Sequence, residues 1–472
     1  MGSIVNKKCL MEEFNKIDKH SDNSTKKRCI LLIADDSLEA VAIYCYYIYK
    51  NNTVFLVGNK KEKKDYLDII FKFKPDVLYI ADKIKEDLKF NIIEVKCLKK
   101  IEYIKCYDYN QFSCYKLVRG YNKKNINSKV ALLMCTSGSV GNGKIVALSY
   151  KNLKSNAKSI IEALHIKQGQ RGALMLPMSY VYGLSVINSY LLADGEILLP
   201  ETSMFRKQYW DFLEKNNVNS FCGVPYTYEL MNRLRVFDRE WKGLKLITQA
   251  GGVMNQTLKE RLLAYTLNRK KCGEDIHLAI MYGQTEATAR MSIFFLDEHP
   301  KKIESVGKAI PGGYFEIIDK NIDGNGEIIY YGDNVCMGYV GGIEDLYIEN
   351  NLIKDKLYTG DIGRLDADGY LYITGRKKRF IKNNGVRISL DELERELGSI
   401  ILKEIVCFED NNIVCILVKD DGDILDVNNC MKKYLCGKRI QIEKIRVKFI
   451  KEFFYLNNGK IDYRKMNETY SV

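Results

Sequence analysis

The stretch VALLMCTSGSVGNGKIVALSY, residues 130–150, places a loop of glycines, hydroxyl side chains and one lysine between two apolar runs. A loop of this composition can turn its backbone N–H groups inward around anionic oxygens, and Lys144 adds a positive charge. An ordinary polar turn between two strands has a similar composition. The stretch therefore predicts a strand–loop–strand unit that is a candidate phosphate site.

The loop matches only part of the Walker pattern. Gly138, Gly143 and Lys144 fit G-x-x-x-x-G-K, but Ile145 stands where Ser or Thr would ligate Mg²⁺. The residues that follow, IVALSY, form an extended apolar run, whereas a Walker loop opens a helix whose N-terminus holds the phosphates. The pattern argues against a P-loop nucleotidase and leaves a phosphate clamp between two strands.

Strand-like and helix-like segments alternate on both sides of this loop. Before it come CILLIAD (29–35), TVFLVG (53–58) and VLYIAD (77–82), and the first is followed by a helical pattern. The region 122–296 repeats the theme with longer elements, including the apolar runs GALMLPM and GEILLP. This alternation predicts an α/β fold with parallel sheets flanked by helices.

The pattern changes twice toward the C-terminus. Between about 305 and 374, short strands are broken by glycines, which predicts a small β-barrel subdomain. Beyond Gly375 a basic run, RKKR, precedes helical and alternating segments that fit a compact α+β domain. We therefore expect a large N-terminal domain (1–375) with two parallel-sheet α/β subdomains plus the barrel, and a small hinged domain (376–472).

Bulk composition limits the function classes. The 472 residues are 46% hydrophobic and 28% charged, which is typical of a globular, multidomain chain. The net charge of +13 is spread along the chain, so we expect the protein to attract anionic ligands and to have no nucleic-acid partner. A basic, non-enzymatic protein that binds RNA stays open as an alternative hypothesis. Fourteen cysteines without a C-x-x-C pair predict reduced thiols in a cytoplasmic protein. The longest apolar stretch, 40–49, is too short to cross a bilayer.

Five further motifs follow the loop in a fixed order: AGG (250–252), MYGQTE (281–286), YTGD (358–361), GRKKRFIKNNGVRI (375–388) and NGK (458–460). Together with the loop they resemble the adenylate-forming superfamily, which includes acyl- and aryl-CoA synthetases, adenylation domains of peptide synthetases and luciferases. The resemblance covers most of the chain. It implies an enzyme that uses ATP and Mg²⁺ to convert a carboxylic acid into an acyl adenylate, with a C-terminal domain that rotates after adenylation.

The resemblance also implies roles for individual residues. The loop would hold the β- and γ-phosphates, and the AGG and YGQTE motifs would contact the nucleotide, with Tyr282 against the adenine and Thr285 on the α-phosphate. Glu286, with Thr136, would ligate Mg²⁺. The remaining nucleotide-binding candidates are Ser137, Gly138, Ser139, Gly141, Lys144, Gly251, Gly252, Gly283 and Gln284.

Four further assignments follow from the later motifs. Asp361 and Arg376 would contact the ribose, and Lys378 would be the hinge residue. Lys382 would lie near the adenylate phosphate or its thiol acceptor. Lys460 is the strongest catalytic candidate, because a lysine on a glycine-containing turn can reach into a closed site and stabilise developing charge. Read without the other motifs, Lys460 would be one of many exposed lysines.

The substrate is less sharply indicated. The acyl pocket is expected around Tyr180, Val224, Ala250 and Gly252, with Tyr180 in place of the family's usual histidine. Amino-acid-activating relatives place an aspartate after the region corresponding to PMSYVYGLSVINSY, but no acidic residue lies between Leu176 and Leu192. This favours an aryl or acyl acid without an amino group, transferred to coenzyme A or to the phosphopantetheine of an acidic carrier protein. The alternative is an amino-acid adenylation enzyme that charges a carrier protein in trans.

Overall fold

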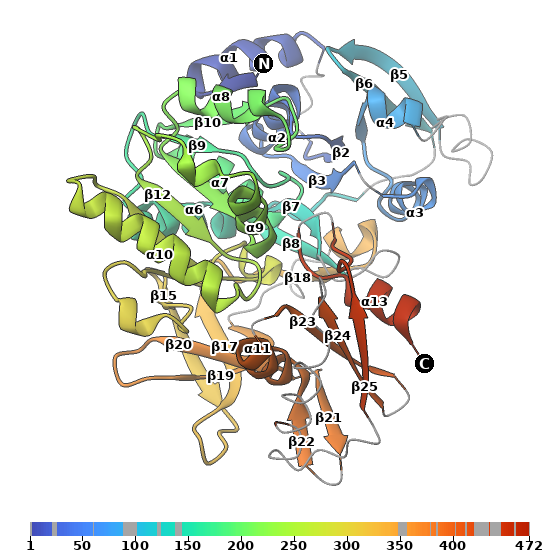
Figure 1. Cartoon of the computed structure of the whole chain (residues 1–472). Coiled ribbons are helices and arrows are strands. Elements are labelled where there is room, and N and C mark those ends of the chain that lie inside the picture. Colours follow the sequence, from blue (N-terminus) through green and yellow to red (C-terminus); the bar gives the residue numbers. More distant parts are fainter. Residues whose placement is uncertain are drawn as a thin grey trace.

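The computed structural model describes most of the chain and is shown in Figure 1. The described residues are 2–20, 26–59, 61–87, 102–119, 124–136, 144–347, 356–377, 379–383, 386–401, 403–410, 413–419, 434, 445–456 and 459–471. Within these ranges the side chains are described as well, except at residues 87 and 119 and at the described residues from 380 to 388, where only the backbone is described.

The first large sheet contains the strand that precedes the quoted loop. Its central strands run parallel and are fully apolar, as expected for strands covered on both faces. Antiparallel strands extend it at both edges. In spatial order the strands are β18 (Gly338–Val340), β8 (Ile145–Ser149), β7 (Val130–Cys135), β3 (Thr53–Gly58), β2 (Cys29–Ala34), β4 (Val77–Ala81), β6 (Phe112–Arg119) and β5 (Glu102–Tyr109).

The second large sheet has the same mixed design. Strands β9 to β13 are parallel, and antiparallel strands flank them at both edges of the sheet. The order is β1 (Gly2–Val5), β10 (Glu196–Pro200), β9 (Arg171–Ala173), β11 (Ser220–Gly223), β12 (Leu246–Gln249), β13 (His277–Tyr282), β14 (Ser292–Phe295) and β15 (Lys308–Ala309). The two sheets confirm the predicted α/β class.

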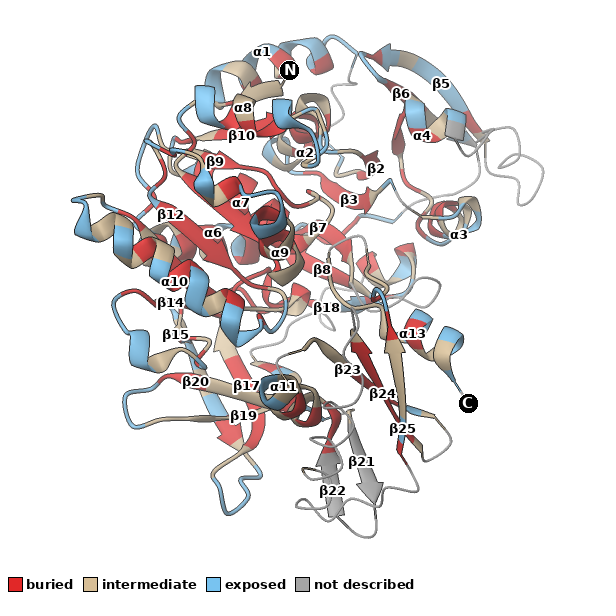
Figure 2. Ribbon diagram, in the orientation of Figure 1, coloured by how far each residue is buried: buried red, intermediate tan, exposed pale blue. Residues whose placement is uncertain are grey.

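Helices join the two sheets into one core. Helix α6 packs on β7 and β8 and also on α7, which covers β9 and β10 of the other sheet. Helices α2 and α7 are apolar on nearly every face, and Figure 2 shows this central region largely buried. The helices of this part are α1 (Lys7–Asp18), α2 (Leu38–Tyr49), α3 (Lys63–Phe73), α4 (Asp82–Asp87), α6 (Tyr150–Leu164), α7 (Val181–Leu192), α8 (Lys207–Lys215), α9 (Pro225–Arg233) and α10 (Gln256–Lys271).

One apolar run is shorter as a strand than its sequence suggests. Only Gly172 and Ala173 of GALMLPM belong to β9. Pro177 then lacks a backbone donor for a sheet ladder, and the N–H of Met178 donates to Asp36 Oδ1 at 2.7 Å instead. The chain therefore leaves the sheet and turns into α7.

A small antiparallel sheet follows where glycine-broken strands were predicted. It comprises β16 (Gly313–Ile318), β17 (Gly326–Gly332), β19 (Lys356–Leu365) and β20 (Leu371–Arg376), in that spatial order. Asp361 on β19 is paired with Arg376 on β20, next to a register shift at Ile362/Gly363. This sheet therefore brings two predicted nucleotide contacts side by side.

The remaining elements build a separate small sheet with an apolar cluster on each face. Its strands are β23 (Ile405–Asp410), β24 (Ile413–Lys419) and β25 (Ile445–Ile450), covered by α11 (Leu390–Ile401) and α13 (Tyr463–Tyr470). A hairpin of β21 (Phe380–Asn383) and β22 (Val386–Ser389) precedes α11. Among the described helices of the whole chain, none has both the length and the apolar character needed to cross a membrane.

Candidate active site

The quoted loop connects two antiparallel strands, as predicted. Cys135 at the end of β7 pairs with Ile145 at the start of β8, and the N–H of Thr136 donates to the carbonyl of Lys144 at 2.9 Å. IVALS is a strand, which excludes the helix of a Walker loop. The loop interior, with candidates Ser137, Gly138, Ser139 and Gly141, lies outside the described residues.

Lys144 and Glu286 meet at one tyrosine that no motif contains. The Tyr339 hydroxyl donates to Glu286 Oε1 at 2.8 Å, and Lys144 Nζ lies 4.3 Å from the centre of the Tyr339 ring. Tyr339 is held there because β18 pairs with β8, directly after the loop. Of the two predicted Mg²⁺ ligands, Glu286 therefore lies near Lys144. Among the described residues no hydrogen bond joins the other, Thr136, to Glu286.

The YGQTE motif forms a tight turn at the carboxyl end of β13. A Cβ at Gly283 would lie 1.6 Å from the carbonyl oxygen of Ala289, so only glycine fits there. The turn continues into a 3₁₀ helix, η2 (Thr285–Ala287), in which Thr285 is buried. The carboxyl ends of parallel strands are where open α/β sheets bind ligands, and this turn places the motif there.

Asp361 is the best-defined carboxylate of the site. Its Oδ2 accepts hydrogen bonds from the Tyr282 hydroxyl at 2.5 Å and from Gln284 Nε2 at 2.8 Å, and its Oδ1 lies 3.3 Å from Arg376 Nε. Asp361 is 4% exposed. Burial, followed by the negative charge of Asp361, raises the pKa of Tyr282, so its hydroxyl is a neutral donor. Three motifs therefore meet at one buried carboxylate.

Lys460 reaches this site from the C-terminal tail. Gly459 has a φ of +75° and opens a turn in which the N–H of Leu456 donates to the carbonyl of Lys460 at 2.7 Å. The turn directs Lys460 Nζ to 5.8 Å from the centre of the Tyr180 ring. A Cβ built on Gly251 would lie 3.7 Å from Lys460 Cε, which places the lysine directly against the AGG motif.

The electrostatic surroundings of Lys460 connect it with the nucleotide motifs. Burial and the positive charge of Arg376 lower the pKa of Lys460 to about 8, while Asp361 and Glu286 oppose this shift. The cation therefore lies within the field of both candidate carboxylates. An anionic ligand placed among these groups would stabilise the charged form of the lysine.

The predicted acyl-pocket residues lie around the same point. Val224 and Ala250 are buried where β11 and β12 end, and Tyr180 is the N-cap residue of α7. A Cβ on Gly251 would lie 2.7 Å from the Tyr180 hydroxyl and 3.0 Å from Val224 Cγ1, so these three residues form one wall. The carbonyl of Gly252 accepts a hydrogen bond from Gln249 Nε2 at 2.9 Å.

Two predicted residues cannot be located by side chain. Lys382 lies in β21 opposite Arg387, but its side chain is outside the described part of the structure. The predicted hinge residue, Lys378, also lies outside the described residues.

Several residues that the fold places here were not predicted from the sequence. Besides Tyr339, these are Tyr226 and Tyr455, whose rings lie 4.7 Å apart between α9 and the C-terminal tail, and Arg290, which is buried four residues after Glu286. The tyrosines gave no local signal, because their contacts depend on distant pairings. Arg290 did give one, since it is a lone charge within the apolar stretch that follows the motif.

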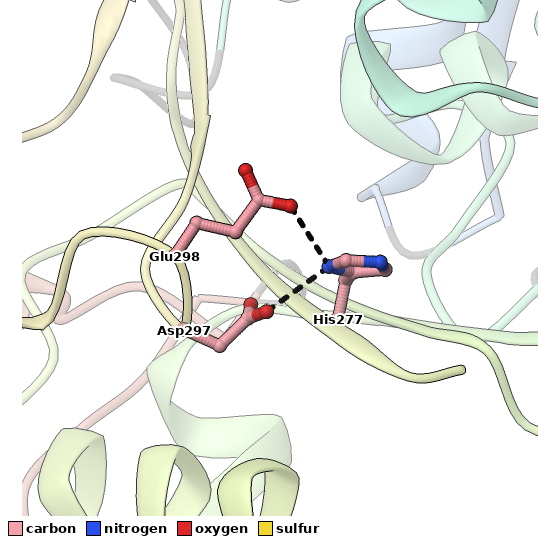
Figure 3. Close-up of side chains that lie close together, drawn as sticks. All are labelled: His277, Asp297 and Glu298. Carbon is pink, nitrogen blue, oxygen red and sulfur yellow. Dashed lines mark hydrogen bonds and ion pairs between the residues drawn. The ribbon is translucent and has the colours of Figure 1, made fainter. Parts of the chain in front are cut away.

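A different group of possible metal ligands lies at the amino end of β13. His277 Nδ1 is 3.0 Å from Asp297 Oδ2 and 3.5 Å from Glu298 Oε1 (Figure 3). Lys270 Nζ lies 2.5 Å from the same Asp297 oxygen, and the N–H of Leu278 donates to the other oxygen at 2.7 Å. Because an ammonium group occupies the position that a cation would take, this cluster is a structural ion-pair network.

Comparison with known proteins agrees with this geometry. A family model described as AMP-binding enzyme matches residues 53–340. A 2-succinylbenzoate–CoA ligase of Lactococcus lactis is 24% identical over 389 residues, 81% of this chain and 77% of that protein. An oxalate–CoA ligase of Arabidopsis thaliana is 30% identical over 290 residues, which span 57% of this chain and about half (52%) of that relative.

Solved structures share the fold across almost the whole chain. An o-succinylbenzoate CoA synthetase from Bacillus subtilis, in complex with its acyl-adenylate intermediate, has a TM-score of 0.69 at 18% identity and covers 97% of this chain and 91% of its own. ATP-bound MatB from Rhodopseudomonas palustris has a TM-score of 0.73 at 18% identity, with 98% and 92% covered. The family model matches more than half of the sequence, and this chain therefore belongs to the AMP-binding enzymes of the adenylate-forming superfamily.

Proposed function

We propose that this protein is an ATP-dependent, AMP-forming carboxylate:thiol ligase. It activates an aryl or acyl acid as an acyl adenylate and transfers the acyl group to a pantetheine thiol. Family membership and the CoA-ligase relatives support this reaction class. The observation that carries the proposal is the position of Lys460, which reaches from the C-terminal tail to Gly251 of the AGG motif and to the Tyr180 ring.

The donor set fits ATP. Asp361 offers two carboxylate oxygens in a fixed orientation, which suits the paired hydroxyls of a ribose, and Arg376 lies beside it. Lys144 supplies positive charge for the polyphosphate, together with the backbone of the glycine-rich loop, and Lys460 supplies it at the α-phosphate. These residues are proposed as the nucleotide site.

The same residues suit a hard divalent cation at one point. Glu286 Oε1 accepts a hydrogen bond from Tyr339, and among the described residues its second oxygen has no hydrogen-bond or ion-pair partner. Magnesium prefers one or two carboxylates together with phosphate oxygens, and a single glutamate near the loop lysine matches this preference. Bound there, Mg²⁺ would neutralise charge on the polyphosphate.

Lys460 has the clearest catalytic role. Attack of a carboxylate on the α-phosphorus concentrates negative charge, and a buried ammonium stabilises such charge more strongly than an exposed one. Because the lysine arrives on the tail, it acts only while the tail is docked. We propose that residues 376–472 form the mobile domain and that movement about Lys378 removes Lys460 after adenylation to admit the thiol, with Lys382 near the acceptor.

The experiment is acid-dependent exchange of labelled pyrophosphate into ATP, tested with a panel of simple carboxylic acids and the twenty amino acids. Exchange with simple acids, followed by AMP release that requires coenzyme A, supports the proposal. Exchange with amino acids alone would favour the adenylation enzyme that charges a carrier protein. Acid-dependent AMP release that requires a pantetheinylated carrier protein and not coenzyme A would identify the acceptor as a carrier. No exchange with any acid would contradict an acyl-adenylate mechanism.

A further inference from the structure

Arg290 carries a buried guanidinium group that has no hydrogen-bond or ion-pair partner among the described residues. The residue is 3% exposed, and both Nε and Nη1 are buried without a hydrogen-bond acceptor. No ion pair or hydrogen bond from the guanidinium is found among the described residues. Buried charges are ordinarily paired, because leaving one unpaired forfeits hydration without compensation. An arginine in this state requires an explanation.

The groups around the guanidinium are neutral. Its Cζ lies 5.1 Å from the centre of the Tyr182 ring, and the groups that interact with it electrostatically are Tyr182, Tyr190 and Cys222. Burial raises the pKa of Tyr182 and Tyr190, and it raises the pKa of the Cys222 thiol to about 11. None of the three is an anion at neutral pH. The protein therefore supplies a cation–π contact but no counter-charge from its described residues.

The backbone of Arg290 is fixed from several directions. Its carbonyl accepts hydrogen bonds from Asn156 Nδ2 at 2.9 Å and from Asn334 Nδ2 at 3.1 Å. A Cβ at Gly283 would lie 2.8 Å from Arg290 Cα, so the arginine packs closely on the nucleotide motif. Such anchoring holds the charge in place before any ligand arrives, which is how specific polar contacts are arranged in binding pockets.

A row of aromatic side chains connects Arg290 with the catalytic lysine. The Tyr182 ring, which faces the guanidinium, lies 6.3 Å from the Tyr180 ring, and the Tyr180 ring lies 5.8 Å from Lys460 Nζ. The hydroxyl of Tyr182 is engaged with the carbonyl of Thr248 at 2.9 Å, so its ring is held in place. Arg290 thus lies at one end of this aromatic row, and Lys460 lies at the other end.

We propose that Arg290 binds a second carboxylate, and that the substrate is a dicarboxylic acid whose other carboxylate is activated beside Lys460. This inference rests on the proposed function. A carboxylate accepts paired, charge-assisted hydrogen bonds from a guanidinium, and it is the counter-charge that the described residues do not provide. The same cation repels an ammonium group, which disfavours α-amino acids as substrates.

The test compares matched acids on the complete protein. Hexanoate is paired with hexanedioate, and phenylacetate with 2-carboxyphenylacetate, in the pyrophosphate-exchange assay. The variants are Arg290→Met, which keeps length and removes charge, and Arg261→Met, which removes an exposed arginine from α10 as a control. We expect the wild type and R261M to prefer the dicarboxylate of at least one pair by tenfold or more in kcat/KM.

In R290M the dicarboxylate should lose about a hundredfold or more in kcat/KM, mainly through KM, while the matched monocarboxylate keeps or gains activity and the KM for ATP is unchanged. In the absence of any acid, R290M should unfold at the same or a higher temperature than the wild type, because an unpaired buried charge has been removed. This second measurement shows that the variant is folded.

The outcomes separate the two proposals. If the wild type activates the monocarboxylate of each pair as well as the dicarboxylate, or if R290M lowers both equally, the role of Arg290 is wrong while the ligase function stands. A lower unfolding temperature for R290M without acid would identify the guanidinium as structural and would also overturn the inference. If the wild type exchanges with no acid at all, the proposed function fails and this inference fails with it.

Discussion

Two arginines with little exposure to solvent, Arg290 and Arg379, differ in their charged neighbours. Arg379 forms ion pairs of 2.7 Å with Asp391 and with Glu394, and its guanidinium lies 3.9 Å from the centre of the Tyr463 ring. Arg290 has an aromatic ring on one face and no acidic partner among the described residues. Side-chain type alone therefore does not separate a structural cation from one that a ligand would complete.

The difference lies in what each cation connects. Arg379 joins the start of the C-terminal region to α11, to β23 through the carbonyl of Cys407 at 3.0 Å, and to α13. Its positive charge is paired with two carboxylates of the protein. Among the described residues the charge of Arg290 meets a tyrosine ring and no carboxylate, although its backbone is held on several sides. A charge paired with carboxylates holds elements together, whereas an unpaired one on a fixed backbone is available to a ligand.

The largest effect on stability should come from breaking the paired site. Arg379→Met leaves Glu394 and Asp391 without their cationic partner, and we expect a loss of about 3 kcal/mol in the free energy of unfolding of the C-terminal region. Chemical denaturation followed by circular dichroism measures this. Arg464→Met, at an exposed ion pair, is the control and should change little. Equal stability of R379M and the wild type would remove the contrast between the two arginines.

The next effect concerns catalysis by a partly buried cation, Lys460. Lys460→Ala should lower pyrophosphate exchange by about 100- to 1000-fold, because a charge aimed at the reacting centre is lost, while ATP affinity stays within a few-fold. Steady-state exchange and equilibrium ATP binding measure the two quantities. Lys465→Ala, an exposed neighbour, is the control. Normal exchange in K460A would group Lys460 with the structural cations.

The pH profile sharpens the same point. The pKa of Lys460 is lowered to about 8, so the free enzyme carries the charged form below pH 8 and loses it as the pH rises through 8. The kcat/KM for exchange should therefore fall about tenfold per pH unit above this value. In Lys460→Arg, whose side chain stays charged, the falling limb should disappear. A flat wild-type profile up to pH 10 would contradict the proposed role.

Much of this arrangement was predictable, because each motif is a short run of neighbouring residues, although the motifs themselves are far apart in the sequence. The loop, the YGQTE turn and the Gly459–Lys460 turn are each built from neighbouring residues, so their local chemistry was visible. Tyr339 was not predictable, since its place beside Glu286 depends on β18 pairing with β8 from far along the chain. Arg290 was visible as a charge, but only the fold shows that its neighbours are neutral.

A smaller effect concerns two carboxyl groups between α9 and the C-terminal region. Burial and the nearby Glu404 raise the pKa of Glu229 to about 7, with Lys419 and Arg233 opposing the shift and Tyr455 close by. A raised carboxyl pKa stabilises the contact below the ordinary value of 4.5, and this stability is lost as the pH rises through 7.

The change that tests this contact is Glu229→Gln, which mimics the protonated form. The variant should gain on the order of 1 kcal/mol in unfolding free energy over the wild type at pH 8 and nothing at pH 4.5. Urea denaturation at both values measures it, with Glu240→Gln, on an exposed segment, as the control. An equal gain at both pH values would show that the contact does not titrate.

The smallest effect is expected where polar partners are already complete, at His277. This residue lies at the opposite end of β13 from Tyr282, roughly 17 Å along the strand. Since Lys270 and the N–H of Leu278 still satisfy Asp297, His277→Ala should leave exchange within about twofold of the wild type. Thermal unfolding in EDTA and in zinc chloride should give the same midpoint for the wild type, because the ammonium of Lys270 already neutralises the cluster. A zinc-dependent rise in the wild-type midpoint that is lost in H277A would show instead that this cluster, like the site around Arg290, awaits a ligand.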